Sequence, residues 1–336
     1  MTGRVVCFGE LLLRLTAPGR ELLLQSGRLD VHVGGAEANV AIGLARLWHD
    51  AAMVSRVPDS ALGDAAAGHL RRYGVDARHV ATAAGRMGLY FLSPGAGLRA
   101  SDIVYDREGS AFALAGPEDF DWDALLDGAS LLHLSGITPA LGPRSAETAA
   151  AAAEVAKAKG ISVSFDGNYR AQLWNRWDSD PKTILSRLVG QADILFGNHR
   201  DISLLLGAQF SGDGEDRRRE ASEAAFAAFP NLALIASTAR HIVDADSHRI
   251  SARIDSPEGA VQTEEVLVAG IIDRIGAGDA FAAGVLHGRL SGLDLDGTVH
   301  SGLALTCLKH SLPGDASLFG PRDIAAFLAG ERDVRR

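Results

Sequence analysis

The stretch Asp273-Arg274-Ile275-Gly276-Ala277-Gly278-Asp279-Ala280-Phe281 joins a glycine-rich turn to the start of a helical pattern. The residues that follow Asp279 are mostly small and apolar, as expected for a helix packed tightly inside a protein. An acid in such a helix is costly unless it has a function. Glycines at a helix start leave N–H groups free to bind a phosphate or a developing anion. A carboxylate beside these amides can accept a proton from an alcohol, so the stretch indicates phosphoryl transfer.

Asp279 also has a simpler interpretation, because an acid in the first helical turn is often only a capping residue. Two other nucleotide-binding patterns are absent from the sequence. Phe281 takes the third glycine position of the dinucleotide fingerprint, and no Gly-x-x-x-x-Gly-Lys-Ser/Thr segment occurs. Any nucleotide must therefore be held in another way.

The composition is that of an ordinary globular protein: 336 residues, 47% hydrophobic and 22% charged, enough for one large domain or one domain with a small appendage. The net charge of −9 argues against a nucleic-acid binder, although arginines can still cluster around an acidic small molecule. Cys7 and Cys307 form no C-x-x-C pair, which favours a reducing compartment. Glu10 and Arg14 interrupt the apolar N-terminal run, and no segment is long enough to span a membrane. We therefore expect a soluble cytoplasmic protein without membrane partners.

Short apolar runs alternate with helical patterns along most of the chain. The runs predict buried strands at 4–9, 52–57, 131–135, 162–166, 194–197 and 233–237. The helical patterns lie at 36–47, 61–73, 144–159, 183–189 and 220–229. This alternation predicts an α/β fold with a mostly parallel central sheet and helices on both faces. Ligands of such sheets bind beyond the carboxyl ends of the strands, where polar clusters at 166–170 and 198–201 should face one crevice.

Two regions, at about 11–33 and 87–113, break this alternation. Both carry short alternating runs, such as Gly88-Leu-Tyr-Phe-Leu, that are typical of antiparallel hairpins. Together they predict a small β-sheet that forms a lid on a single domain spanning residues 1–336. The arginine run at 217–219 is flanked by acids, and we interpret it as a solvated helix face without a function.

Residues 273–281 resemble the C-terminal signature of the ribokinase-like, phosphofructokinase-B type sugar kinases. The early segment Gly34-Gly35-Ala36-Glu37-Ala38-Asn39-Val40-Ala41 resembles the glycine-pair sugar-binding turn of the same family. The two motifs stand in the family's order, and the resemblance covers essentially the whole chain. Within the family, the chain is most similar to the 2-keto-3-deoxygluconate kinases. That likeness rests on Gly88-Leu-Tyr-Phe-Leu, Val104-Tyr-Asp-Arg-x-Gly-Ser-Ala, Asp166-x-Asn-x-Arg-x-x-Leu-Trp and Leu308-Lys-His-x-x-Pro-Gly-Asp.

The resemblance implies an ATP-dependent carbohydrate kinase that phosphorylates the terminal hydroxyl, O6, of 2-keto-3-deoxygluconate to give 2-keto-3-deoxy-6-phosphogluconate. Asp279 is then the general base, and the amides of Gly276, Ala277 and Gly278 are the anion hole for the γ-phosphoryl group. The implied cofactors are ATP and Mg²⁺, with room for a monovalent cation.

The resemblance also implies the binding residues. Those for the sugar acid are Gly34, Gly35, Asn39, Tyr90, Tyr105, Arg107, Arg170 and Asp315. Those for the nucleotide are Asn168, Asn198, Ser237, Arg240, Gly276 and Gly278, and Asp201 is expected to hold the metal through water. Guanidinium groups suit a carboxylate, and tyrosines suit a sugar surface. The alternatives are packing inside the lid for the two tyrosines, a surface salt bridge for Arg107 and a turn role for Asp315.

Three positions depart from the family pattern. Asp201 replaces the usual glutamate of Asn-x-x-Glu, and a helix-capping role for Asn198 or Asp201 is the alternative. Arg274 replaces a threonine, so it either contacts phosphate or points to solvent. Residues 237–241, Ser-Thr-Ala-Arg-His, lack the lysine or glycine of the turn that usually borders ATP, which leaves the preference for ATP over another triphosphate open.

Other functions remain open at this point. The same fold can act on 2-keto-3-deoxygalactonate, fructose, ribose, a 5-ketogluconate derivative or a nucleoside, but a neutral sugar leaves Arg107 and Arg170 without an anionic partner. A non-catalytic sugar-acid sensor is a second alternative, which the intact Asp279 argues against. A homodimer through the lid strands is also expected, because a small sheet has edges and apolar faces that need cover.

Overall fold

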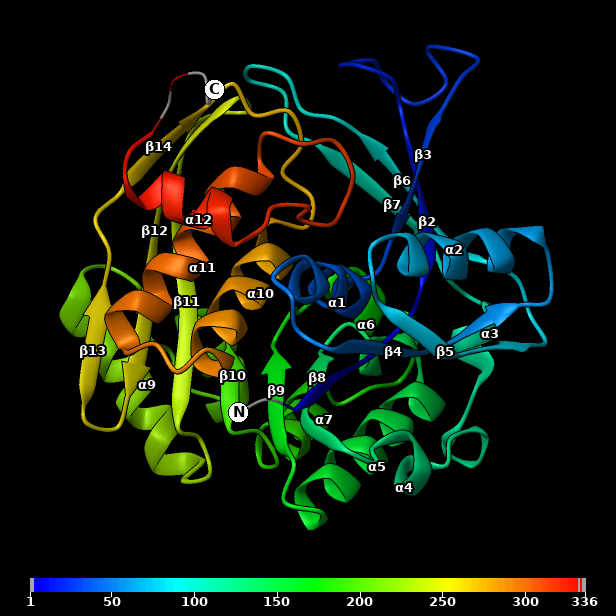
Figure 1. Ribbon diagram of the computed structural model, residues 1–336, viewed down its shortest axis with the longest axis horizontal. Coiled ribbons are helices and arrows are strands. Elements are labelled where there is room, and N and C mark those ends of the chain that lie inside the picture. Colours follow the sequence, from blue (N-terminus) through cyan, green and yellow to red (C-terminus); the bar gives the residue numbers. More distant parts are fainter. Residues whose placement is uncertain (1–2, 332, 334–336) are drawn as a thin grey trace.

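The computed structural model describes residues 3–331 and 333 and contains a ten-stranded sheet between two layers of helices (Figure 1). Its main path runs, in spatial order, through β13 (Gly259–Gln262), β12 (Ser247–Ser256), β11 (Leu234–Asp244), β10 (Ile194–Phe196), β9 (Ser162–Asp166), β8 (Ala129–Ser135), β1 (Arg4–Phe8), β4 (Ala51–Pro58) and β5 (Asp76–Ala83), and β14 (Val266–Ala269) pairs with β12. All neighbours from β11 to β5 pair in parallel. Only β12 pairs in antiparallel fashion, with β11, β13 and β14. The mostly parallel sheet predicted from the sequence is therefore confirmed.

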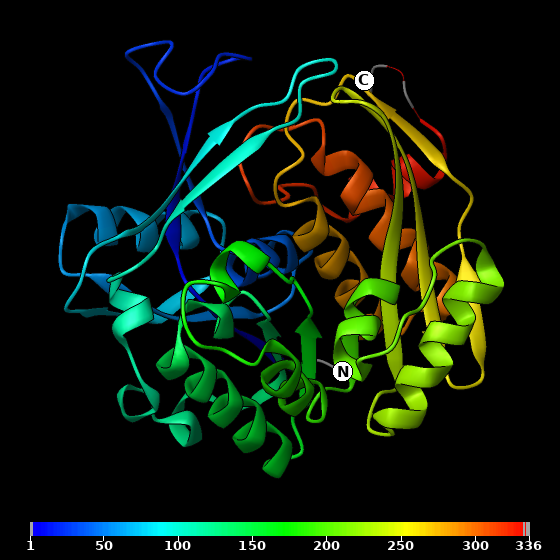
Figure 2. The same cartoon turned by 180° about the vertical axis from the view of Figure 1, so that it is seen from behind.

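The helices cover both faces of this sheet, as Figures 1 and 2 show from opposite sides. On one side lie α1 (Ala36–Arg46), α2 (Ala61–Arg72), α10 (Ala277–Leu290), α11 (Leu295–Lys309) and α12 (Pro321–Leu328). On the other lie α3 (Ala111–Leu114), α4 (Trp122–Leu125), α5 (Pro143–Ala158), α6 (Ala171–Trp174), α7 (Pro181–Val189), α8 (His199–Leu206) and α9 (Glu215–Ala228). Two single 3₁₀ turns, η1 (Pro117–Asp119) and η2 (Pro139–Leu141), join this second layer.

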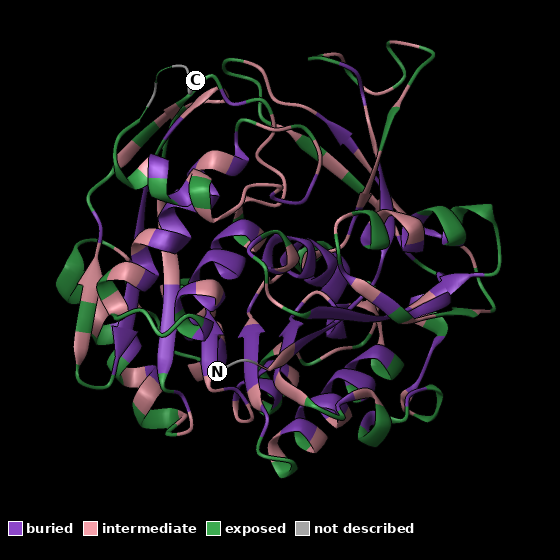
Figure 3. Ribbon diagram, in the orientation of Figure 1, coloured by how far each residue is buried: buried purple, intermediate pink, exposed green. Residues whose placement is uncertain are grey.

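Each layer of helices encloses its own hydrophobic cluster, so the central strands are buried on both sides (Figure 3). The four residues from Val5 to Phe8 on β1 are all at most 1% exposed, which explains why this strand reads as a continuous apolar run. Within the described residues, no helix combines the length and the apolar character that crossing a bilayer requires.

The two regions that break the alternation form one separate four-stranded sheet, with the order β3 (Asp30–Gly34), β2 (Leu12–Thr16), β6 (Gly88–Ser93) and β7 (Asp102–Asp106). Strands β2 and β3 form one antiparallel pair and β6 and β7 another, and the two pairs join in parallel through β2 and β6. The predicted small sheet of two hairpins is therefore confirmed. Its edge strands carry the exposed side chains of Val31 and Val104, but the dimer contact expected there stays a prediction.

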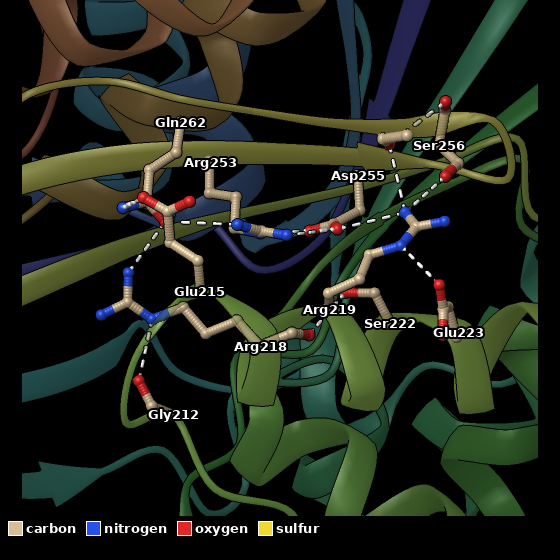
Figure 4. Close-up of polar contacts among 11 residues, drawn as sticks. Gly212, Glu215, Arg218, Arg219, Ser222, Glu223, Arg253, Asp255, Ser256 and Gln262 are labelled. Atoms are coloured by element: carbon tan, nitrogen blue, oxygen red, sulfur yellow. Dashed lines mark hydrogen bonds and ion pairs between the residues drawn. The ribbon is translucent and has the colours of Figure 1, made fainter.

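The interpretation of the arginine run as a solvated face is wrong for two of its three members (Figure 4). Arg219 on α9 donates to the carbonyl oxygens of Ser256 (2.8 Å) and Gly259 (3.1 Å) at the β12–β13 turn. Arg218 donates to Oε1 of Gln262 on β13 at 3.0 Å. Only Arg217 pairs solely with a neighbour on its own exposed helix face. The arginines thus attach α9 to the edge of the large sheet.

Candidate active site

A large cleft lies beyond the carboxyl ends of the parallel strands, between the large and small sheets, with a volume of about 1370 Å³. Pockets for one small ligand usually measure about 300–1,000 Å³, so this cleft has room for two substrates side by side. Tyr90 and Tyr105 of the small sheet and the start of α10 are part of its lining.

The glycine turn at the start of α10 is built around two glycines with different roles. Gly276 caps the helix in the left-handed region, with φ of 78°, and a Cβ there would lie 1.6 Å from the carbonyl oxygen of Asp315. Gly278 has only open space where a Cβ would be. Among the described residues, no acceptor meets the N–H of Gly276 or Gly278, whereas the N–H of Ala277 makes a long bond of 3.3 Å to the oxygen of Arg274. Two of the three predicted amides are therefore free for an anion.

Asp279 lies in the first turn of α10, where Nδ2 of Asn39 donates to its Oδ2 at 2.7 Å. Burial raises the pKa of Asp279 to about 8, and the negative charges of Asp166, Asp315 and Glu37 add to this rise. The hydrogen bond from Asn39 acts in the opposite direction, because it favours the ionised form. A carboxyl with a pKa near the working pH is well suited to accept a proton.

The start of α1 fixes Asn39 beside Asp279. Gly35 precedes this helix with φ of 140°, and a Cβ there would lie 2.2 Å from the oxygen of Glu10, so only glycine fits. Glu37 is completely buried, and its Oε1 accepts hydrogen bonds from the N–H (3.1 Å) and Oγ (2.7 Å) of Ser135 at the end of β8. This contact anchors the first turn of α1 on the large sheet and sets the position of Asn39.

Tyr90, Arg107 and Asp315, which were predicted to bind the sugar acid, line the cleft and also form hydrogen bonds with other side chains. The hydroxyl of Tyr90 donates to Oδ2 of Asp315 at 2.6 Å. Nε of Arg107 bonds to Oε2 of Glu10 at 2.5 Å, and both side chains are buried. The surface salt bridge considered for Arg107 is therefore a buried one, and its guanidinium still lines the cleft. A buried pair holds its geometry firmly, because removing either partner leaves an unpaired charge.

Several other guanidinium groups in the cleft, among them those of Arg170, Arg240 and Arg274, have no carboxylate within 4 Å among the described residues. Burial lowers the pKa of Arg274, and the nearby charge of Arg170 lowers it further. Arg240 behaves in the same way, through burial and the charge of Arg274. Arg274 thus lines the cleft together with Arg170 and Arg240. Positive charges that lie close together without ion-pair partners favour binding of an anionic ligand.

Residues 237–241 form no turn, which corrects the sequence prediction for the nucleotide side. They continue strand β11, which pairs with β12 as far as Asp244. Ser237 lies opposite Arg253 and Arg240 lies opposite Ile250. Because side chains alternate along a strand, these two residues project from opposite faces of the sheet. Arg240 projects toward the layer that contains α10, since Ile250 belongs to the core on that side.

Asn198 and Asp201 form a capping box at the start of α8. Oδ2 of Asp201 accepts from the N–H of Asn198 at 2.8 Å, and Oδ1 of Asn198 accepts from the N–H of Arg200 at 2.8 Å. The capping alternative is thus realised, although both residues also line the cleft. Burial raises the pKa of Asp201. Nearby, Asn168 adopts a φ of 37°, a conformation that asparagine tolerates better than most residues.

The cleft brings together nearly all of the residues predicted from the sequence. Its lining includes Gly35, Asn39, Tyr90, Tyr105, Arg107, Asn168, Arg170, Asn198, Asp201, Ser237, Arg240, Gly276, Ala277, Gly278, Asp279 and Asp315. Gly34 is not part of this lining; a Cβ on Gly34 would lie 2.3 Å from Oδ2 of Asp315, so its lack of a side chain makes room for that carboxylate. Direct contact between Gly34 and a sugar acid stays a prediction.

Residues 2–318 match the family model described as pfkB family carbohydrate kinase. The chain belongs to the pfkB family of carbohydrate kinases. Its ribokinase-like fold, with a large mostly parallel sheet and a small separate one, is that of its structural neighbours.

Three individual proteins illustrate this pfkB relationship. The chain is 31% identical over 330 residues to a 2-dehydro-3-deoxygalactonokinase of Haloferax volcanii, covering 98% of both chains. The crystal structure of 2-dehydro-3-deoxygluconokinase from Thermotoga maritima superposes with a TM-score of 0.93 at 37% identity, covering 98% of this chain and 100% of that one. A ribokinase II of Escherichia coli, solved with ATP and Mg²⁺, shares the fold at 18% identity with a TM-score of 0.81, covering 98% and 100%.

Sequence reasoning assigned no individual role to three charged residues in or beside this cleft: Arg14, Glu37 and Asp166. Arg14 and Glu37 are completely buried, and Asp166 belongs to the polar cluster at 166–170 that was expected to face the crevice. Burial and the charge of Asp201 raise the pKa of Asp166 to about 7, and its carboxyl lines the cleft. A signal was present for each. Asp166 ends a predicted strand, whereas Arg14 and Glu37 each stand in a run of otherwise apolar or small residues. Their partners, however, come from distant segments.

Proposed function

We propose that the chain transfers the γ-phosphoryl group of ATP to O6 of 2-keto-3-deoxygluconate, giving 2-keto-3-deoxy-6-phosphogluconate. The observation that carries this proposal is the arrangement at the start of α10. Asp279, with its raised pKa, stands beside the free amides of Gly276 and Gly278 in a cleft with room for two ligands.

In this mechanism Asp279 accepts the proton of the attacking hydroxyl as the new O–P bond forms. The N–H groups of Gly276 and Gly278 stabilise the charge that develops on the transferred group. Arg274 and Arg240 are placed to offset the remaining phosphate charge, since neither has a carboxylate partner among the described residues.

The side chains present fit a magnesium ion held mainly through water and nucleotide oxygens. In the described part of the chain no three acids or histidines converge as a metal site. Asp201 and Asn198, at the start of α8, are the residues that would hold the ion through water. Such an ion supplies positive charge to the phosphate oxygens.

The remaining lining of the cleft suits a sugar acid better than a neutral sugar. Arg170 offers an unpaired guanidinium for the carboxylate, and Tyr90, Tyr105 and Asp315 offer groups that bind hydroxyl or keto oxygens. The name of the Thermotoga maritima relative, 2-dehydro-3-deoxygluconokinase, supports this substrate class. The lining therefore suits an acceptor with one negative charge.

A second candidate acceptor is 2-keto-3-deoxygalactonate, the C4 epimer. The Haloferax volcanii relative that the chain matches over 98% of its length carries the name of that activity. The charge pattern of the cleft serves both epimers equally.

The test is a coupled assay of ADP formation with a panel of both epimers, 5-keto-2-deoxygluconate, fructose, ribose and a nucleoside. NMR of each product identifies the phosphorylated carbon. We expect turnover with the 2-keto-3-deoxy acids and a 6-phosphate product. Turnover with neutral sugars alone would reject the substrate class, and sugar-acid binding without ADP formation would instead indicate a sensor.

The variant that tests the proposed base is Asp279→Asn, which preserves the shape of the side chain. It should lower kcat by roughly two to four orders of magnitude and leave the affinity for the acceptor close to that of the wild type. Near-normal turnover would remove Asp279 from the role of base.

A further inference from the structure

A buried cluster of charges joins the small sheet to the turn that precedes α10. Arg14, in the middle of β2, is completely buried. Its Nη1 and Nη2 bond to the two carboxylate oxygens of Asp273 at 3.1 and 2.5 Å. Its Nε forms an ion pair with Oδ1 of Asp315 at 3.1 Å. One guanidinium therefore bridges two carboxylates from different segments.

The carboxylate of Asp273 also binds main-chain N–H groups in and near the glycine turn. Its Oδ1 accepts the N–H of Ile275 at 3.0 Å, and its Oδ2 accepts the N–H of Gly314 at 3.0 Å. The buried ammonium of Lys309 holds the same turn from the other side, with Nζ donating to the carbonyl oxygens of Asp273 (3.2 Å) and Leu312 (3.1 Å). The main chain next to Gly276 is thus fixed by charged side chains.

Asp315 connects the cluster to the sugar end of the cleft. Its Oδ2 accepts the hydroxyl of Tyr90, and both residues line the cleft. Its carbonyl oxygen packs against Gly276 so closely that no Cβ would fit. A continuous path of contacts therefore runs from Tyr90 through Asp315 and Arg14 to Asp273 and Gly276.

The charges in this path balance, since Arg14 and Lys309 oppose Asp273 and Asp315. Inside a protein such charges are poorly screened, so moving one changes the energy of the others. A ligand that hydrogen-bonds to Asp315 or Tyr90 changes how strongly Asp315 holds Arg14. Arg14 in turn holds Asp273, which shapes the anion-binding turn.

We propose that Arg14 is a positioning residue that couples acceptor binding at Tyr90 and Asp315 to the shape of the phosphate-binding turn at Gly276. This inference rests on the proposed kinase function. It requires that acceptor and nucleotide bind with positive cooperativity, in the usual range of about 5- to 150-fold.

The experiment is calorimetric titration of the full chain with the magnesium complex of a non-hydrolysable ATP analogue. It is done with and without a saturating amount of whichever acceptor the substrate panel identifies. In the wild type, we expect the acceptor to lower the Kd of the analogue at least about fivefold. Arg14→Lys keeps the charge but cannot bridge two carboxylates. In this variant the ratio of the Kd without acceptor to the Kd with acceptor should fall toward one.

Tyr90→Phe is the second variant, since it removes only one hydroxyl and keeps the buried charges paired. It should also reduce the ratio, even if Arg14→Lys fails to fold. Arg28→Lys, an exposed arginine beside the same sheet, is the matched control and should retain the wild-type ratio.

A ratio near one in the wild type, or the wild-type ratio in folded Arg14→Lys and Tyr90→Phe, would overturn the inference. Either result leaves phosphorylation of the acceptor intact. Failure of the proposed function would show instead as absence of turnover across the panel.

Discussion

At the scale of single residues, the hydrogen bond from Asn39 to Asp279 favours the ionised form of that carboxyl. In the proposed mechanism Asp279 must be ionised to accept a proton, and its pKa is raised to about 8, so kcat/KM for the acceptor should rise with pH and level off above about 8. Asn39→Leu removes the bond that favours the ionised form, so the midpoint should move up by about one pH unit. Rate measurements from pH 6 to 10 test this. An unchanged midpoint in the variant would mean that another group sets the profile.

Two neighbouring glycines offer a matched comparison at the same scale. Gly276→Ala places a Cβ against the oxygen of Asp315 and forces a left-handed backbone on alanine, so the folded state should lose several kcal/mol. Gly278→Ala meets open space in a helical turn, so the melting temperature should stay level or rise. The added methyl group would occupy space that the proposed mechanism assigns to the phosphates, so nucleotide affinity should fall. Melting curves and nucleotide titrations separate the two effects; normal affinity in Gly278→Ala would show that no ligand approaches there.

At the scale of elements, the β6–β7 hairpin reaches across the cleft to the turn between β11 and β12 (Figures 1 and 2). The N–H of Ala245 donates to the oxygen of Gly97 at 2.9 Å. Nη1 of Arg20 pairs with Oδ2 of Asp246 at 2.6 Å, and Arg99 donates to the carbonyl oxygen of Arg20. These contacts bridge the small and large sheets. They are exposed and few, so they can open readily.

Charge reversal tests this bridge. Arg20→Asp or Asp246→Arg alone should weaken it, while the double variant restores an ion pair of opposite direction. Exposed pairs are worth about 0.2–1 kcal/mol, so the amide of Ala245 should exchange hydrogen up to about fivefold faster in each single variant. Hydrogen exchange followed by mass spectrometry of the β11–β12 turn measures this. Equal exchange in all four proteins would show that the ion pair adds nothing to the contact.

The elements whose patterns are local were predicted well, and the exceptions have physical causes. The α1, α2 and α5 helices begin and end within one residue of their predicted limits. Strand β5 (Asp76–Ala83) was not predicted, because it is an edge strand with many partly exposed residues and no apolar run. Helix α9 begins at Glu215, before the predicted start at 220, and its additional first turn carries Arg218 and Arg219, which contact β13 and the β12–β13 turn. The apolar pattern used for the prediction does not extend to these charged residues.

At the scale of the whole molecule, buried carboxyls and buried histidines give stability opposite dependences on pH. Burial raises the pKa of Asp166 to about 7 and of Asp279 to about 8. Aspartates of the unfolded chain lose their protons near pH 4, so these two groups make stability fall as pH rises from about 4 to 8. Burial lowers the pKa of His133 to about 3 and of His310 to about 4. These histidines make stability rise with pH through about 6.5, and the rise is nearly complete by about pH 7.5.

Between pH 7.5 and 8.5 the carboxyl effect therefore dominates. The free energy of unfolding of the ligand-free protein should fall by roughly 1 kcal/mol over this interval, which lowers the melting temperature by about one degree. Asp279→Asn removes the larger of the two carboxyl contributions to this pH dependence. The melting temperature of the variant should therefore change less with pH and should exceed that of the wild type at pH 8.5. Calorimetric scans at both pH values check this. A wild-type melting temperature that rises over the interval would contradict it.

Local sequence determined the parallel sheet, the two hairpins, the glycine turn and the acid that follows it. These features depend on side-chain periodicity and on backbone freedom, such as the left-handed φ of Gly276, which neighbouring residues encode. Only the tertiary structure decided the partners of the charges. Asn39 meets Asp279 across 240 positions, and Arg14 meets Asp273 across 259. Such pairs form because folding buries both groups together, where charges are poorly screened. A local sequence pattern does not indicate which distant segments will be buried against each other.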